Sequence, residues 1–226
     1  MIEVNGLEKS YGNKKVVDNL SFKINEGELF ALLGCNGAGK STTIKMMLGL
    51  VKKDGGEILL PKDVLIGYSP ETPYFPPFLT GKEVLEYYGK LQKIPKKELI
   101  HQCERLLEEV GLENDGTKVR HYSKGMLQRL ALAQALLGNP TILILDEPCA
   151  GLDAMGRIEM LNLIHQLKKS GKTILMNSHI LSDIEKVCDC GIIMKKGKLI
   201  RHFIRSDITA ENTLENMFVE AVDESL

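Results

Sequence analysis

A short glycine-rich loop motif constrains this sequence more than any other feature. The pattern GxxxxGK[ST] is matched by residues 34–41, which read GCNGAGKS. An apolar run, Leu29–Leu33, precedes the motif, and a helix is predicted after it, reaching about Leu48 and closed by Gly49. A buried strand, a glycine-rich loop and a helix in this order form the context in which the motif binds phosphates. The sequence therefore predicts an α/β core that holds a nucleoside triphosphate.

The residue types in the loop fit a triphosphate with its magnesium ion. Without side chains at the three glycines, successive N–H groups can converge on phosphate oxygens at the positive end of the helix dipole. Lys40 would reach the β- and γ-phosphates, and Ser41 would place its hydroxyl on Mg²⁺. An ordinary glycine turn is the alternative, which the full motif and its flanks disfavour. The residues predicted to bind ATP here are Gly34, Asn36, Gly37, Ala38, Gly39, Lys40, Ser41 and Thr42.

A second apolar run, Ile142–Leu145, ends in two carboxylates. As the end of a buried strand, it would place Asp146 and Glu147 at the carboxyl edge of the sheet, where α/β proteins bind ligands. Asp146 is predicted to hold the Mg²⁺ shell, and Glu147 to act as the general base on the attacking water. The alternative is a solvated acidic turn before Pro148.

Composition narrows the class of partner. The chain has 226 residues, 43% of them hydrophobic, enough for one large domain or two closely packed lobes. Its 29 basic and 30 acidic residues nearly cancel, which disfavours a nucleic-acid partner. Five cysteines, an odd number, indicate a reducing compartment. Cys188 and Cys190 could hold a metal, but no second Cys/His pair lies nearby in sequence, so buried bystanders are favoured.

Two further features concern membranes. The start of the chain, Met1–Val4, lacks the basic stretch and apolar run of a secretion signal, so we expect no leader. The longest apolar runs fall far short of the roughly 20 residues that a spanning helix needs. We therefore expect no direct membrane insertion, and any membrane association should depend on a partner.

Hydrophobic periodicity divides the chain into three kinds of segment. Alternation at Leu20, Phe22 and Ile24 predicts antiparallel strands joined by a turn at Gly12-Asn13. From the capping-box spacing at Thr80 to about residue 137, the pattern is helical throughout. Strand and helix then alternate again, which favours parallel strands with right-handed crossovers. The predicted later elements are strands at Ile142–Leu145, Thr173–Met176 and Gly191–Met194 and helices at Ala154–Lys169 and Leu181–Val187.

These segments predict a domain division. The α/β core with its antiparallel β lobe is expected at 1–79 and 138–206, and an inserted α-helical lobe at 80–137. A C-terminal amphipathic helix is expected within 207–226, packed on its own core.

In this order the motifs resemble those of ABC transporter ATPases over nearly the whole chain. Residues 122–126, YSKGM, look like the signature loop, and residues 150–153, AGLD, look like the D-loop. His179 is similar to the switch histidine, and Tyr11 lies where the family stacks an aromatic ring on adenine. From the residue itself, a His after a buried strand could hydrogen-bond the γ-phosphate, although such a His is more often structural.

The resemblance implies a single ABC ATPase domain that binds ATP and Mg²⁺. Ser123 and Gly125 would contact the γ-phosphate bound on a second copy, so two chains, or this chain and a related subunit, would close head to tail. By itself, Ser123 could also simply cap its own helix. The family further implies integral membrane permease subunits, a cytoplasmic position on the inner face of the membrane through those partners, and export. The implied catalytic set is Lys40, Glu147 and His179.

Three positions depart from the family's pattern. Cys35 replaces a proline, and Lys124 replaces the first glycine of the signature pair. Glu71 occupies the position of a glutamine in the Q-loop, where a carboxylate could still reach Mg²⁺. Two alternatives remain: a soluble ABC-type ATPase acting on nucleic acid or ribosomes, and a regulatory module that binds ATP without hydrolysing it. The first would normally show a coiled-coil insertion or a second nucleotide domain, and neither is evident in the sequence.

Overall fold

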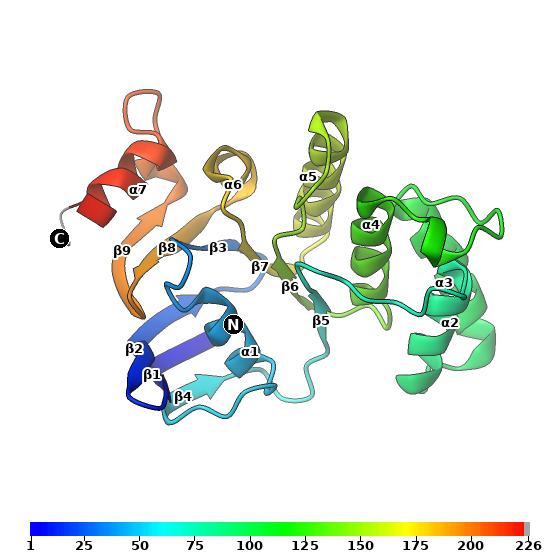
Figure 1. The fold of residues 1–226 in the computed structure, drawn as a ribbon, viewed down its shortest axis with the longest axis horizontal. Coiled ribbons are helices and arrows are strands. Elements are labelled where there is room, and N and C mark those ends of the chain that lie inside the picture. The colour runs from blue at the N-terminus through cyan, green and yellow to red at the C-terminus, as the bar shows by residue number, and fades with distance from the viewer. Residues whose placement is uncertain (224–226) are drawn as a thin grey trace. The chain divides into compact units, whose positions relative to one another are not determined.

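The fold was obtained as a computed structural model that describes residues 1–223. The chain groups into two compact units. Unit 1 holds Met1–Val64 and the residues from Lys168 onward, and unit 2 holds Leu65–Leu167 (Figure 1). The predicted division into core, helical lobe and C-terminal helix follows other boundaries and stays a prediction.

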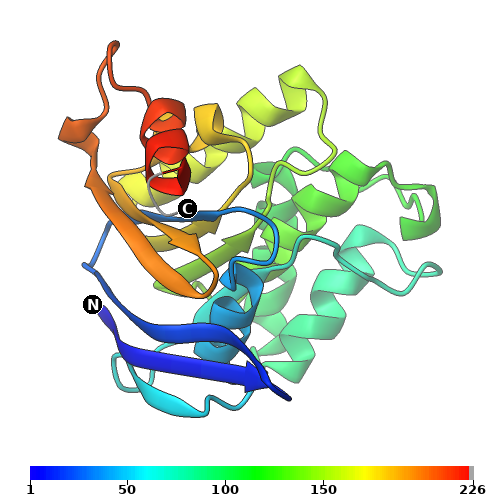
Figure 2. The same cartoon turned by 60° about the vertical axis from the view of Figure 1, so that its left-hand side comes forward.

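Unit 1 contains a three-stranded antiparallel sheet. Its strands are β1 (Ile2–Tyr11), β2 (Lys14–Ile24) and β4 (Gly55–Leu59), in the order β2-β1-β4. The first two form a hairpin with Val4 opposite Phe22, and the turn between them uses Gly12 at φ 57°. Alternate side chains such as Leu20 and Ile24 are fully buried, as the period-2 pattern predicts. In Figure 2 these strands lie side by side, in blue and cyan.

The second sheet region of unit 1 is mostly parallel. It has the order β7-β3-β8-β9, formed by β7 (Thr173–Asn177), β3 (Leu29–Gly34), β8 (Cys190–Lys195) and β9 (Lys198–Ile204). Strand β3 pairs in parallel with both neighbours, and β9 returns antiparallel after a turn at Gly197. Around them lie α1 (Lys40–Met47), α6 (Leu181–Val187), the short turn η2 (Arg205–Asp207) and α7 (Leu214–Asp223). Helix α7, red in Figure 2, packs beside β8 and β9. The end of the predicted C-terminal helix, 224–226, lies outside the described residues.

Unit 2 is mainly helical. It contains α2 (Gly81–Leu91), α3 (Lys96–Glu109), η1 (Val119–His121), α4 (Lys124–Ala135) and most of α5 (Ala154–Lys169). Helix α2 begins at a capping box, because Thr80 Oγ1 accepts from the Glu83 N–H and a Glu83 carboxylate oxygen accepts from the Thr80 N–H. Strands β5 (Ile66–Ser69) and β6 (Ile142–Asp146) pair in parallel. Helix α4 lies directly on β5, where Gly67 leaves room for the carbonyl of Ala135.

The predicted fold class is confirmed: parallel strands, an antiparallel β region and a helical stretch are all present. Helices α1, α5 and α6 begin and end within a residue or so of their predicted bounds. Three strands lie outside the segments predicted as strands, namely β4, β5 and β9. Each is short or mostly half-exposed; in β9 only Phe203 is buried, so the period-2 signal is weak.

Candidate functional site

In unit 1 the loop between β3 and α1 has the backbone that its motif predicts. Gly37 and Gly39 have φ values of 79° and 106°, in the left-handed region that favours glycine. A β-carbon on Gly39 would also lie 2.6 Å from the carbonyl oxygen of Val16. Helix α1 starts directly after Gly39, with no side-chain cap and no acidic residue in its first turn. Its N-terminal N–H groups and dipole are therefore presented to an anion.

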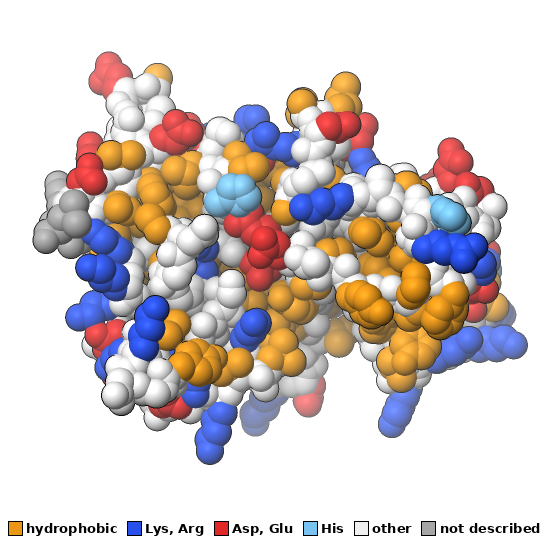
Figure 3. All heavy atoms as spheres, in the orientation of Figure 1, with side chains coloured by type: hydrophobic (Ala, Val, Ile, Leu, Met, Phe, Trp, Pro, Cys, Tyr) orange, Lys and Arg blue, Asp and Glu red, His pale blue; other side chains and the backbone are white. Residues whose placement is uncertain are grey.

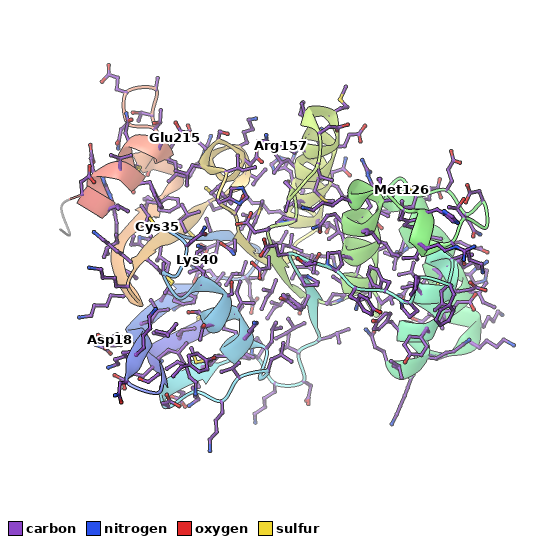
Figure 4. The ribbon with its side chains drawn as sticks, viewed as in Figure 1. Asp18, Cys35, Lys40, Met126, Arg157 and Glu215 are labelled. Atoms are coloured by element: carbon purple, nitrogen blue, oxygen red, sulfur yellow. The ribbon has the colours of Figure 1, made fainter. Side chains whose placement is uncertain are left out.

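The lysine of the motif is held inside the loop. Lys40 is only 9% exposed, and its ammonium donates to the carbonyls of Gly34 at 2.7 Å and Cys35 at 3.3 Å. Figure 4 labels Cys35 and Lys40 in this segment between β3 and α1. Ser41 is exposed and Thr42 partly so, while Thr43 is buried and donates to the Gly39 carbonyl. The buried charge lies against the loop where a phosphate would bind.

His179 follows the end of β7 in the same unit. Because β3 and β7 are parallel, with Leu32 opposite Asn177, the phosphate loop and His179 leave the same edge of the sheet. Ser178 is buried, and its hydroxyl accepts from the Ile180 N–H at 3.1 Å, which fixes the turn. The imidazole of His179 is exposed at this turn.

Tyr11 ends β1 with half of its surface exposed, 51%. The ammonium of Lys9 lies 5.4 Å from the centre of its ring and pairs with Asp54 at 2.8 Å. Asp54 also accepts from the Ser10 N–H at 2.7 Å, and these contacts, Lys9 first, lower the pKa of its carboxyl group. The Tyr11 ring thus lies against the ammonium of Lys9, which the ion pair with Asp54 holds in place, and half of the residue's surface stays exposed.

Unit 2 carries the acidic strand end. Asp146 and Glu147 are 6% and 7% exposed at the end of β6. Since β5 and β6 are parallel, with Ser69 opposite Leu145, the loop through Glu71 leaves the same edge. The pKa of nearby Tyr68 is raised, first by burial and then by the charges of Asp146 and Glu71. Three carboxylates therefore gather at one edge of this strand pair.

The signature segment, also in unit 2, begins α4. Ser123 is the N-cap of the helix, and its hydroxyl accepts from the Met126 N–H at 3.1 Å. The structural role considered for Ser123 is thus present, and the exposed hydroxyl retains its own proton to donate. Gly125 is covered by Leu152, whose Cδ2 would be 3.1 Å from a β-carbon there. Met126, labelled in Figure 4, marks this end of the helix.

Several side chains of the chain are of the types that bind metals. Burial raises the pKa of Cys188 and of Cys190 to about 12, so both thiols are protonated near neutral pH. Within residues 1–223 no group of three His, Cys, Asp or Glu side chains could hold a metal. Ser41 and Asp146 supply a hydroxyl and a carboxylate, the hard oxygen donors that Mg²⁺ takes alongside phosphates and water. Each of these two side chains, one in unit 1 and one in unit 2, fits by its chemistry the oxygen ligands of Mg²⁺.

Two supporting contacts were not predicted from the sequence. Lys9 and Asp54 lie 45 residues apart and meet only through the pairing of β1 with the approach to β4. Gln128 donates to the Glu71 carbonyl at 2.8 Å, joining α4 to the loop after β5. Neither pairing leaves a local signal, although Gln128 follows the signature loop by two residues.

Together, a phosphate-binding loop before an uncapped helix, a parallel strand ending in buried carboxylates and a helical insertion define a P-loop nucleotide-binding protein of the α/β class. A family model described as ABC transporter matches residues 17–150, more than half of the chain. The chain belongs to the ABC transporter ATP-binding family.

Individual relatives agree. An uncharacterized ABC transporter ATP-binding protein of Synechocystis, sll0415, is 44% identical over 83% of this chain. The matched part covers only 57% of the length of that relative. The bacitracin transport ATP-binding protein BcrA of Bacillus licheniformis is 43% identical over 88% of this chain and 68% of its own. Among solved structures, the dimeric post-hydrolysis state of the ATP-binding cassette MJ0796, bound to ADP and Pi, has a TM-score of 0.82 at 25% identity, covering 91% of this chain and 99% of that one.

Proposed function

We propose that this chain binds MgATP and hydrolyses it as the nucleotide-binding subunit of an ABC exporter. One observation carries the proposal: the glycine loop opens onto an uncapped helix that begins with a buried lysine. Asp146 and Glu147, both nearly buried at a strand end, supply the carboxylates that the chemistry needs. The hydrolysing activity of the family is consistent with the ADP and Pi held by the MJ0796 cassette.

Each side chain has a distinct task in the proposed reaction. Lys40 leaves its loop carbonyls to neutralise the β- and γ-phosphate oxygens, and Glu147 accepts a proton from the attacking water. His179 donates to the γ-phosphate and keeps the water in line. Bound through Ser41 and Asp146, magnesium would neutralise charge that develops on the phosphates. Glu71 lies at the same edge as Asp146 and would touch the metal or its water.

The nucleotide-binding site would be completed by a second chain. Ser123 is exposed and Gly125 partly exposed at the start of α4, and we propose that they contact the γ-phosphate held by the partner copy in a head-to-tail dimer. A pseudo-dimer with a related subunit would use the same surfaces. The dimeric form of the MJ0796 cassette supports this assembly.

Unit 2 also offers a surface for membrane subunits. Tyr74 and Phe78 are 84% and 67% exposed, and Tyr87 is half-exposed. Tyr74 also lines a hollow of about 250 Å³, together with the aromatic side chains of Tyr68, Phe75 and Tyr88. Figure 3 shows hydrophobic side chains gathered on the face of this unit. Exposed aromatic clusters of this kind mark protein contacts, so we propose that integral membrane permease subunits dock here.

This docking would place the chain on the cytoplasmic, inner face of the membrane. Within the described part of the chain, no helix is long and apolar enough to cross a bilayer. Copurification with the coexpressed permease should be lost in Phe78→Asp, while ATP turnover by the isolated chain persists. Retained copurification would exclude this surface.

The decisive experiment measures nucleotide binding and phosphate release separately. Lys40→Ala should abolish MgATP binding, and Glu147→Gln should bind MgATP but lower phosphate release by about 10²- to 10⁴-fold, the usual worth of a general base. Undiminished binding by Lys40→Ala would overturn the site. A wild-type chain that binds but never releases phosphate would instead identify a regulatory ATP-binding module.

A further inference from the structure

Two short segments of unit 2 interlock through a pair of glycines. A β-carbon on Gly151 would lie 2.6 Å from both Cε and Nζ of Lys124, so the end of the lysine side chain rests on this glycine. In return, Leu152 covers Gly125, 3.1 Å from where its β-carbon would be. The start of α4 and the turn at Gly151 therefore each place one side chain over a glycine of the other.

The turn at Gly151 is connected to the proposed general base by local backbone hydrogen bonds. Ala150 N–H donates to the Glu147 carbonyl at 2.9 Å, and Leu152 N–H donates to the Cys149 carbonyl at 3.2 Å. Glu147 itself has φ 53°, an uncommon value for a non-glycine residue. Asp153 then begins α5 by accepting from the Gly156 N–H at 2.7 Å. Only three residues separate Gly151 from Glu147, and hydrogen bonds restrict the backbone between them. A displacement of the turn at Gly151 would therefore also displace the backbone of Glu147.

Lys124 makes no ion pair with any residue that the structure describes, and it is exposed at the first position of α4. No acidic residue lies in the first helical turn, and a cation there opposes the helix dipole. Charge pairing within the chain therefore does not explain where the side chain lies. The position of the Lys124 side chain is explained instead by packing of its methylene groups on the backbone of Gly151.

From this interlock we infer that Lys124 is a positioning residue for Glu147. The methylene groups of Lys124 hold the turn at Gly151 against the start of α4. This turn fixes the position of the Glu147 backbone. The inference rests on the proposed function, in which Ser123 at the same helix start contacts the nucleotide of a second copy. Lys124 would then transmit closure over the partner's nucleotide to the base of its own chain.

Three substitutions separate packing from charge. Lys124→Met keeps a long flexible chain without charge, whereas Lys124→Gly, which restores the family's usual residue, removes both. Gly151→Ala pushes the lysine end away and keeps its charge, and the strain of alanine at φ 72° is measured separately in the double variant with Lys124→Gly.

Packing predicts that Lys124→Met stays within about twofold of the wild-type kcat, while Lys124→Gly and Gly151→Ala lose about tenfold or more, the scale of a small misplacement of a catalytic group. KM and MgATP affinity should be unchanged, because the phosphate loop is untouched. Hydrogen exchange at the Ala150 and Leu152 amides should accelerate in the two damaging variants alone.

A Lys124→Gly variant with wild-type kcat and wild-type exchange would overturn the inference, as would Lys124→Met falling as far as Lys124→Gly. The exchange measurement needs no turnover, so it tests the interlock even if the chain does not hydrolyse ATP. Absent phosphate release from the wild type would count against the proposed function alone, and unchanged exchange in Lys124→Gly against this inference alone. Equal MgATP binding by all variants controls for folding.

Discussion

Gln128 donates a hydrogen bond from its side-chain amide to the backbone carbonyl of Glu71 at 2.8 Å. The donor lies on α4, two residues beyond the signature loop, and the acceptor lies in the loop after β5. Gln128 is almost fully buried, so the bond is shielded from competing water. The segment proposed to meet a second copy is thus joined to the loop proposed to meet the metal.

The first prediction concerns this bond. Gln128→Leu keeps most of the volume but leaves the Glu71 carbonyl without its side-chain donor, so we expect the free energy of unfolding to fall by about 1–3 kcal/mol. Urea unfolding measures the change. Gln166→Leu, on exposed α5 surface, is the matched control and should change stability little. Equal midpoints for Gln128→Leu and the wild type would show that the bond contributes nothing.

The second prediction concerns the charge at Glu71. Glu71→Gln removes one of three carboxylates at the edge where β5 and β6 end, so MgATP binding should persist and ATP without magnesium should meet less repulsion. The ratio of the ATP affinities with and without magnesium measures this and should be smaller in the variant than in the wild type. The pKa of Tyr68, raised partly by Glu71, should move back toward its ordinary value, which a phenolate absorbance titration detects. Loss of ATP binding would show that this loop is wrongly assigned.

How far the sequence predicts this site depends on how local each feature is. The phosphate loop is specified by consecutive residues, because its glycines, its lysine and the start of the following helix are adjacent in the sequence. Asp146 and Glu147 are equally local, as the end of one buried strand. Such features are recognisable without a structure because the motif and the conformation coincide.

Contacts between distant segments could not be predicted in this way. Lys9 reaches Asp54 only because β1 pairs with β4, and its register contains a shift between Asn5 and Glu8. Lys124 lies on Gly151 because two segments 27 residues apart meet on the surface of unit 2, and nothing in either segment specifies the other. Hydrophobic periodicity predicts which face of a helix or strand is buried, but not which distant residue it contacts. Contacts such as Lys124 with Gly151 can therefore be identified only from the structure.

The third prediction concerns Cys35, which is exposed in the phosphate loop, while the other four cysteines are buried. Its backbone carbonyl accepts from Lys40 at 3.3 Å, so a nucleotide that draws Lys40 away and fills the loop should cover the thiol. We expect N-ethylmaleimide to label Cys35 first and MgATP to slow that labelling several-fold. Mass spectrometry of the labelled peptides measures both rates.

The buried cysteines serve as an internal control. Burial raises the pKa of Cys103 to about 11, so its unreactive thiol should label slowly with or without nucleotide. Equal labelling rates for Cys35 in the presence and absence of MgATP would contradict the assignment of this loop to the phosphates.

The fourth prediction concerns Tyr11 and the ion pair beneath it. Stacking of a base on an aromatic ring is worth about 1–3 kcal/mol, so Tyr11→Ala should weaken ATP binding by roughly 5- to 150-fold. Tyr11→Phe keeps the ring and should bind nearly as the wild type does. Lys9→Met removes the cation 5.4 Å from the ring centre and the partner of Asp54, and should produce a smaller loss through a less ordered ring.

Inorganic triphosphate provides the control for Tyr11, because it has no base to stack. Titration calorimetry should give the same affinity for triphosphate in Tyr11→Ala and in the wild type, since the loop at Lys40 is unchanged. If Tyr11→Ala weakened triphosphate and ATP equally, the ring would act on the fold of the hairpin rather than on adenine. If neither changed, the adenine would lie elsewhere on unit 1.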